Sequence, residues 1–432
     1  MIIRVSTAAV LSLLFAGIQA VYGNPPASGT LVLKRATVID GNGGPPLPGR
    51  TLIIENGRIA DVFGDGEKPV PADADVRDMG GFFIMPGLID SHVHISGSTD
   101  ECLTRALMGG VTTIREMGGD GAYLKTLQKA IERGEIDAPD IYFSAIMGGP
   151  EFIQQDGRVR LATPPSYALG TAPWARGVDE TTNLRAVVRE AKACGAIALK
   201  LYAGLSAGLV RRLTEEAHRQ GLRVWAHSAV SPANVEDVVE AGVDSVSHAV
   251  GFLLPPAWRY GQDNSLAVDP RLLNPERMSR LAEAMKKSGT FLDPTLAIGR
   301  ESLERASGDP DKRHWIEGLW SKVVRDVHKA GVPVVAGTDF FLPQAAGQMP
   351  AIHREMRLLV ELAGLTPLEA ITAATKNGAL CLGLDRTFGT IEPGRAADLL
   401  VLKKDPSATI ENTTAIAFVV KRGKIISPDG GR

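Results

Sequence analysis

The chain has 432 residues, of which 44% are hydrophobic and 22% are charged, and its formal net charge is −2. This composition is typical of a globular protein large enough for one big domain and one small one. A net charge so close to zero offers no basic face, so we expect a small-molecule substrate and no nucleic-acid partner.

Residues 1–23 are predicted to be a secretory signal peptide. A short start ending in Arg4 precedes an apolar run over residues 5–20, and small residues at Ala20 and Gly23 mark the expected cut. The run is short for a transmembrane span, which needs about 20 residues. We expect a secreted or periplasmic protein without stable membrane insertion after cleavage, and a retained membrane anchor is the alternative.

Residues 24–81 and 387–432 have the pattern of short β-strands with turns. Asn56-Gly57 is a tight hairpin signal between two β-branched runs, and the stretches 397–402 and 415–426 look similar. We therefore predict one small composite β-sandwich domain assembled from both ends of the chain.

Residues 82–386 alternate short apolar strands with amphipathic helical segments, and a glycine often marks the helix end before a strand. Eight strands are predicted, at residues 82–86, 111–115, 141–145, 197–201, 222–226, 243–247, 290–293 and 332–336. Alternation of this kind implies a parallel sheet. The fold class is therefore α/β, a (β/α)8 TIM barrel whose active site lies at the C-terminal ends of the strands.

Candidate metal ligands follow these strands at their C-terminal ends. His92 and His94 stand at positions i and i+2 of a strand, so both side chains point the same way and can meet one metal ion. Four later strands end in a further candidate each: Lys200, His227, His248 and Asp339. The three cysteines, Cys102, Cys194 and Cys381, lack metal-ligand spacing and are expected to be buried thiols.

Several segments together resemble the metal-dependent amidohydrolase superfamily, and within it the imidazolonepropionases and Xaa-Pro dipeptidases (prolidases). The segments that carry the resemblance are 85–94 (MPGLIDSHVH), 110–115, 198–202, 225–228, 244–248, 294–296, 336–339, 366–375 and 393–399. They span nearly all of the chain that follows the predicted signal peptide.

The resemblance implies a site for two divalent metal ions, expected to be zinc. In such a site His92, His94 and Asp339 hold the buried ion and His227 and His248 the outer one, while Lys200 bridges both as a CO2-derived carbamate. An ordinary solvated lysine is the alternative for Lys200, because mononuclear sites without this lysine occur among the imidazolonepropionases. Its presence favours the binuclear, dipeptidase-like branch.

The mechanism implied is attack by metal-activated hydroxide. Coordination lowers the pKa of water from about 15.7 towards 7, and Asp339 acts as the catalytic proton shuttle to the leaving amine. We expect a metal-dependent hydrolase of carbon–nitrogen bonds that cleaves the amide bonds of dipeptides or N-acyl amino acids. Lactone or phosphotriester hydrolysis at the same site is the alternative, and a scaffold that has lost its metals is a third interpretation.

Substrate contacts are less strongly indicated. Arg115 could bind a substrate carboxylate or form an ion pair with Glu116 or another neighbour, and relatives would have aspartate at 116. Tyr142 and Tyr202 could reach a carbonyl oxygen or pack in the core, and His353 could line the pocket mouth. The apolar run 250–256 after strand six indicates a hydrophobic subsite. The sequence leaves open whether the protein forms a homo-oligomer.

Overall fold

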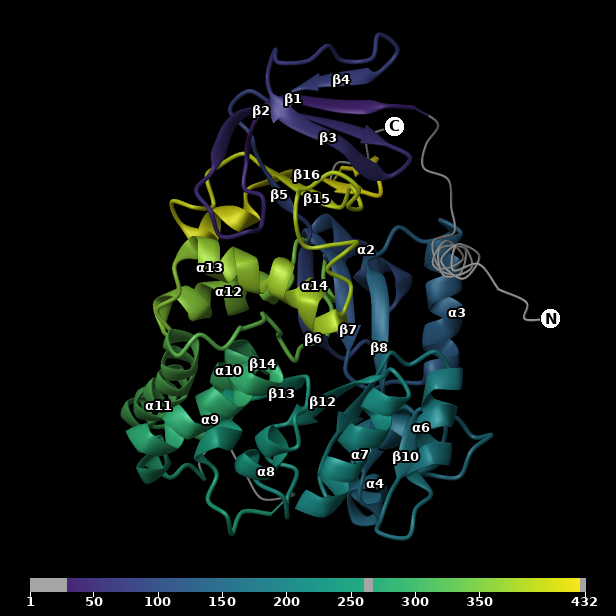
Figure 1. The fold of residues 1–432 in the computed structure, drawn as a ribbon, viewed down its shortest axis with the longest axis vertical. Coiled ribbons are helices and arrows are strands. Elements are labelled where there is room, and N and C mark those ends of the chain that lie inside the picture. Colours follow the sequence, from purple (N-terminus) through teal and green to yellow (C-terminus); the bar gives the residue numbers. More distant parts are fainter. Residues whose placement is uncertain (1–28, 260–266, 428–432) are drawn as a thin grey trace, which may run out of the picture.

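The computed structural model describes residues 29–259 and 267–427, so the predicted signal peptide lies outside the described residues. Within those ranges, no helix combines the length and the apolar character needed to cross a membrane. The chain forms a mixed β-sheet from its two ends and an α/β barrel between them (Figure 1).

Both ends of the chain contribute to one mixed sheet of eight strands, which we call the terminal sheet. Its strands are β1 (Leu31–Val38), β2 (Leu47–Glu55), β3 (Arg58–Gly64), β4 (Asp75–Asp78), β5 (Phe83–Pro86), β15 (Leu399–Leu402), β16 (Ile416–Lys421) and β17 (Lys424–Ile426). Asn56 and Gly57, with φ of 50° and 70°, turn β2 into β3, because a two-residue hairpin needs positive φ at both central residues. The predicted assembly of β-strands from both ends of the chain is confirmed, and these strands form one continuous sheet.

The barrel wall is a parallel sheet in chain order. Its strands are β6 (Leu88–Val93), β7 (Val111–Glu116), β8 (Asp140–Gly148), β11 (Ala198–Leu201), β12 (Arg223–His227), β13 (Ser245–Ser247) and β14 (Phe291–Asp293). The predicted strand 332–336 closes the barrel: the N–H of Val335 donates to Leu292, and the N–H of Ser91 donates to Ala336. The α/β barrel is confirmed.

The prediction that residues 82–86 form the first barrel strand is wrong. As β5 it pairs with β1 and β15 in the terminal sheet, and β6 is the first barrel strand. The two strands are separated only by Gly87, whose N–H donates to the carbonyl of Asp398. The chain therefore passes from one sheet to the other within a single residue.

Helices surround the barrel (Figure 1). They are α2 (Asp100–Met108), α3 (Gly121–Glu132), α6 (Leu184–Ala193), α7 (Ala207–Arg219), α8 (Val235–Glu240), α9 (Pro275–Ser288), α10 (Leu296–Ala306), α11 (Pro310–Lys329), α12 (Ile352–Glu361), α13 (Pro367–Ala373) and α14 (Lys376–Leu382). The expected glycine stops are present, as at Gly221 and Gly331, whose φ values of 76° and 87° suit residues without a Cβ.

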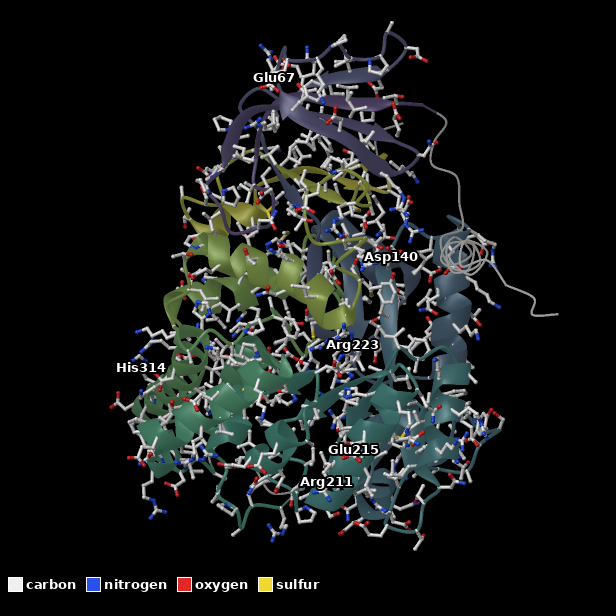
Figure 2. All side chains as sticks on the ribbon, viewed as in Figure 1. Glu67, Asp140, Arg211, Glu215, Arg223 and His314 are labelled. Carbon is white, nitrogen blue, oxygen red and sulfur yellow. The ribbon has the colours of Figure 1, made fainter. Side chains whose placement is uncertain are left out.

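The terminal sheet contacts the barrel at the N-terminal ends of its strands. Lys421 of β16 donates to the carbonyl of Thr112, and Arg422 pairs with Asp140, the first residue of β8. Figure 2 shows Asp140 at this border. The C-terminal ends of the strands therefore lie at the other end of the barrel, where the long connections are, including α4 (Pro150–Gln155), α5 (Gly157–Leu161), and the short 3-10 helices η2 (Ala249–Leu253) and η3 (Pro270–Leu273).

Candidate metal centre

The six predicted ligands all lie at or just beyond the C-terminal ends of barrel strands. They are His92 of β6, His94 just after it, Lys200 of β11, His227 of β12, His248 after β13 and Asp339 after the segment 332–336. This is the end of the strands where TIM barrels carry their active sites.

The carboxylate of Asp339 lies among three of the imidazoles. Its Oδ1 is 3.4 Å from His92 Nε2 and 3.2 Å from His94 Nε2, and its Oδ2 is 3.9 Å from His248 Nδ1. One ligand atom each of His92, His248 and Asp339 lies within 4.8 Å of the others. Ligand atoms about 2 Å from a shared zinc ion are about 3.3 Å apart, so these separations suit a common metal.

Three buried imidazole nitrogens support that fit. The Nε2 atoms of His92, His94 and His227 are buried, and no described residue forms a hydrogen bond with them. Buried polar atoms normally have a partner. Burial lowers the pKa of His92 and His227, so both rings are neutral and each can present a lone pair. These donors fit a divalent ion.

The ring of His227 adjoins that of His248, which in turn adjoins the ring of His92. The ring centroids of His227 and His248 are 4.5 Å apart, and those of His92 and His248 are 5.1 Å apart. Thr295 Oγ1 lies 2.8 Å from His248 Nδ1 and orients that ring. The imidazoles of β6, β12 and β13 therefore form one continuous group.

Lys200 is fully buried beside this group, and its Nζ donates to Ser247 Oγ over 2.9 Å. Burial lowers the pKa of the amine well below its ordinary value of 10.5. The neutral amine is the form that reacts with CO2, so this lysine is suited to become a carbamate.

Asp293, at the end of β14, was not singled out from the sequence. Its Oδ2 lies 2.7 Å from His92 Nδ1 and accepts from Arg115 Nη2 and Ser247 Oγ, both over 2.9 Å. A carboxylate on the second ring nitrogen fixes the orientation of a metal-binding histidine. The signal available in the sequence was its place at a strand end, the same as for the candidate ligands.

Arg115 lies beneath the site. It is fully buried, and its guanidinium contacts Asp293, the carbonyl of Ser91 and Cys381 Sγ, with its Cζ 4.7 Å from the Trp225 ring. These contacts favour the ion-pair interpretation, with Asp293 as the partner in place of Glu116.

Glu116 supports His94 instead. Its carboxylate accepts the backbone N–H groups of Ile95 and Gly118 over 2.6 and 3.0 Å, and it lies 3.7 Å from His94 Nδ1. The glutamate at this position therefore holds the chain that leaves β6 directly after the His-x-His pair.

The site backbone is strained at three positions. His248, Thr295 and Asp339 have φ values of 73°, 50° and 56°, in the left-handed region where each such residue costs about 1–3 kcal/mol. Gly337 is packed so closely that a Cβ there would lie 2.2 Å from Asp293 Oδ1 and 2.7 Å from His92 Cβ. The Gly-Thr-Asp sequence thus allows the chain to pass close to His92 and present Asp339.

The other predicted substrate residues are distributed over both ends of the barrel. Tyr202 lies at the site, with its ring 4.6 Å from that of His227, and its hydroxyl donates to the carbonyl of Met117. Tyr142 stands near the start of β8, 6.4 Å from the ring of Phe388. Its position is at the barrel end that faces the terminal sheet.

His353 also lies far from the pocket mouth. Both ring nitrogens are used, since Nε2 contacts the carbonyl of Gly109, just before β7, and Nδ1 contacts Thr413 Oγ1. Burial lowers the pKa of this histidine to about 4, so the ring is neutral. These contacts place His353 among the packing residues at the N-terminal end of the barrel.

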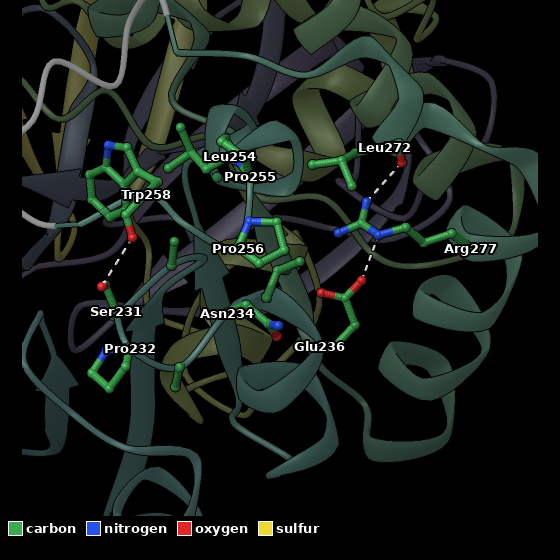
Figure 3. A pocket seen from close by; sticks show the side chains of 14 residues that line it. Ser231, Pro232, Asn234, Glu236, Leu254, Pro255, Pro256, Trp258, Leu272 and Arg277 are labelled. Carbon is green, nitrogen blue, oxygen red and sulfur yellow. Dashed lines mark hydrogen bonds and ion pairs between the residues drawn. The ribbon is translucent and has the colours of Figure 1, made fainter.

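A cavity of about 110 Å³ lies between the connections that follow His227 and His248 (Figure 3). Its walls include Leu254, Pro255 and Pro256 of the apolar run after β13, and Trp258 just beyond that run. Figure 3 also shows the ion pair of Glu236 with Arg277 at one side of the cavity. Ala229 and Gly251, two and three residues beyond these candidate ligands, line it too.

An α/β barrel with a His/His/Asp cluster at the C-terminal ends of its strands defines a TIM-barrel protein with a candidate metal site. The chain belongs to the amidohydrolase family, whose sequence profile matches residues 83–426. It is therefore a hydrolase that acts on carbon–nitrogen bonds.

Individual relatives agree with this assignment. The chain is 26% identical to ochratoxinase from Aspergillus niger over 92% of this chain and 87% of that protein. It is 24% identical to imidazolonepropionase from Rhizorhabdus wittichii, over 85% and 91%. A solved Xaa-Pro dipeptidase with bound methionine shares the fold with a TM-score of 0.72 and 21% identity, over 92% of this chain and all of that one.

Proposed function

We propose that the protein is a secreted, binuclear metal-dependent amidohydrolase that cleaves the amide bonds of dipeptides or N-acyl amino acids. The observation that carries the proposal is the convergence of the buried imidazole nitrogens of His92, His94 and His227 with the Asp339 carboxylate at the C-terminal end of the barrel. A buried lysine with a lowered pKa beside them supports a binuclear site over a mononuclear one.

The ligands are assigned as in the family. His92, His94 and Asp339 would hold one ion, His227 and His248 the other, and a carbamate on Lys200 would bridge them. When bound, such ions supply an activated water and polarise the scissile carbonyl. Zinc is the metal proposed, because imidazole and carboxylate donors suit it.

The protein's own groups position the reaction and move its proton. Asp293 holds the His92 ring through Nδ1, and Thr295 holds His248. Asp339, fixed by its backbone N–H to the carbonyl of His92, takes up the proton of the attacking water and delivers it to the leaving amine. The cavity after β13 would supply, on its side lined by Leu254, Pro255, Pro256 and Trp258, a subsite for a nonpolar side chain of the substrate.

The test is a substrate panel on protein produced with zinc and bicarbonate, combined with metal analysis. We expect two zinc ions per chain and release of free amino acid from dipeptides or N-acyl amino acids. Turnover of lactones or phosphotriesters without any amide hydrolysis would replace the proposal with the alternative reaction. Secretion is tested separately, by cell fractionation and sequencing of the mature N-terminus, where a chain that starts near residue 24 is expected.

A further inference from the structure

A second arginine, Arg158, lies next to the candidate metal centre. It belongs to α5, in the long connection that follows β8, and its guanidinium carbon is 4.8 Å from the ring of Tyr202. The Tyr202 ring is in turn 4.6 Å from the ring of His227. The cation is therefore only one aromatic ring away from a candidate metal ligand.

One edge of the guanidinium is held and the other is open. Asp156 accepts from Nε over 3.1 Å and from Nη2 over 2.7 Å, whereas Nη1 has no acceptor in residues 29–259 and 267–427. The side chain of Arg158 is 37% exposed and that of Asp156 only 5%. The Nη1–Nη2 edge can thus bind a second carboxylate in the bidentate manner that arginine favours.

Arg115 and Lys200, which lie beside the candidate metal ligands, cannot do this. Arg115 is fully buried and bonded to protein groups on all sides, and Lys200 is fully buried and bonded to Ser247. Arg158, by contrast, is fixed by Asp156 and by its cation–π contact with Tyr202, and solvent reaches it. Its orientation is set before any ligand arrives.

We propose that Arg158 binds the free α-carboxylate of the substrate and thereby restricts the enzyme to amides whose leaving amine is an amino acid. This inference rests on the proposed amide hydrolysis and names the substrate class of that same site. An amino acid amide or ester in the same position leaves the guanidinium edge unpaired, so such substrates are discriminated against.

The experiment compares N-acetyl-L-phenylalanine with N-acetyl-L-phenylalaninamide in the holoenzyme. In the native protein we expect kcat/KM to be about 10- to 100-fold higher for the free carboxylate. In R158Q the preference should fall to about threefold or less, through a higher KM for the carboxylate substrate and little change for the amide. The matched control is R160Q on the same helix, because Arg160 is exposed and donates to the carbonyl of Gln154.

Binding measurements keep this inference separate from the proposed function. Calorimetric titration with the same two compounds reports carboxylate recognition whether or not either is hydrolysed. Tighter binding of the carboxylate that disappears in R158Q but not in R160Q supports Arg158, even if amide hydrolysis is absent and the proposed function fails. Equal binding of the two compounds by the native protein, or an equal loss for both in R158Q, would overturn the inference.

Discussion

Full burial of a lysine side chain disfavours its charged ammonium form, because burial removes the water that solvates the charge. Lys200 has no exposed surface, and its Nζ has a serine hydroxyl as partner. The neutral amine that burial favours is a nucleophile towards CO2, and the carbamate so formed has two oxygens suited to a pair of divalent ions. The bridging role proposed for Lys200 follows from this chemistry.

Lys200→Ala tests that role. We expect kcat/KM to fall by more than the 10- to 100-fold that outer-shell changes at metal sites cost, with partial recovery when formate, acetate or propionate is added, because a short carboxylate can replace the carbamate oxygens. Activity and zinc content are measured together. Lys192→Ala is the control, since that amine lies on the surface and bonds the carbonyl of Gln220. Unchanged activity in Lys200→Ala would contradict the bridging role.

Asp293 gives a second prediction at the level of single residues. Asp293→Asn keeps the shape of the side chain but removes the charge that faces His92 Nδ1 and Arg115. We expect zinc affinity, measured by competition with a chelator, to weaken by about 10- to 100-fold. Asp244→Asn should leave the affinity unchanged, because Asp244 pairs with His218 and Arg223 away from the candidate ligands. Equal affinities in both variants would show that Asp293 does not orient His92.

At the scale of elements, the connection from β14 to α10 depends on a buried carboxyl group. Glu355 of α12 accepts the backbone N–H groups of Leu296 and Ala297 over 3.0 and 2.7 Å, at the start of α10. The residue just before them is Thr295, which contacts His248. Glu355 therefore anchors the strained turn on which the position of one candidate ligand depends.

The titration of Glu355 gives a pH-dependent prediction. Burial raises its pKa from 4.5 to about 8, so the folded protein holds a proton there that the unfolded chain loses above pH 4.5. The folded state therefore loses relative stability as the pH rises from about 4.5 to about 8. In Glu355→Gln this loss is removed, so the variant should gain in Tm relative to the native protein between pH 5 and 9. Glu361→Gln, an exposed change on the same helix, should give a curve parallel to that of the native protein.

The sequence predicted most barrel strands because each one is a short apolar run, in several cases with a glycine before it and a polar residue after it. It could not separate β5 from β6, because the two form a single apolar stretch and the choice of sheet depends on pairing with β15, more than 300 residues later. Nor could it identify the partner of Arg115, which lies 178 residues away. Glu116 stayed open as that partner, although adjacent residues of a strand point to opposite faces.

The sequence identified the six candidate ligands because each lies at or just after the C-terminal end of a predicted barrel strand. Arg158 and Asp293 were missed. Arg158 lies in a long connection without periodicity, so no pattern in the sequence connects it with Tyr202. Asp293 also lies at a strand end, but it has no histidine beside it, and the motif segment 294–296 begins just after it. Contacts in the folded structure, and not the neighbouring sequence, distinguish Arg158 and Asp293 from the other arginines and aspartates of the chain.

At the scale of the whole molecule, the terminal sheet and the long connections occupy opposite ends of the barrel (Figure 1). A cluster of charges joins the sheet to the barrel. Lys421 Nζ donates to Asp140 over 2.8 Å and to Asp398 over 2.6 Å, and Arg422 pairs with the other oxygen of Asp140. Despite burial, Lys421 and Arg422 keep the pKa of Asp140 below its usual value, so the carboxylate remains ionised in the interface.

Lys421→Met should weaken the attachment of the terminal sheet to the barrel. Loss of the amine leaves two nearly buried carboxylates facing each other, and breaking a buried pair costs about 3–5 kcal/mol. We expect a lower Tm and earlier proteolytic cleavage at the junction between β5 and β6. The control is Lys424→Met, only three residues away, because its pair with Asp137 is exposed and such pairs contribute about 0–1 kcal/mol. If the two variants unfold at the same temperature, the buried cluster does not hold the terminal sheet on the barrel, and the apolar packing of Leu400 and Leu402 in the barrel core must do so.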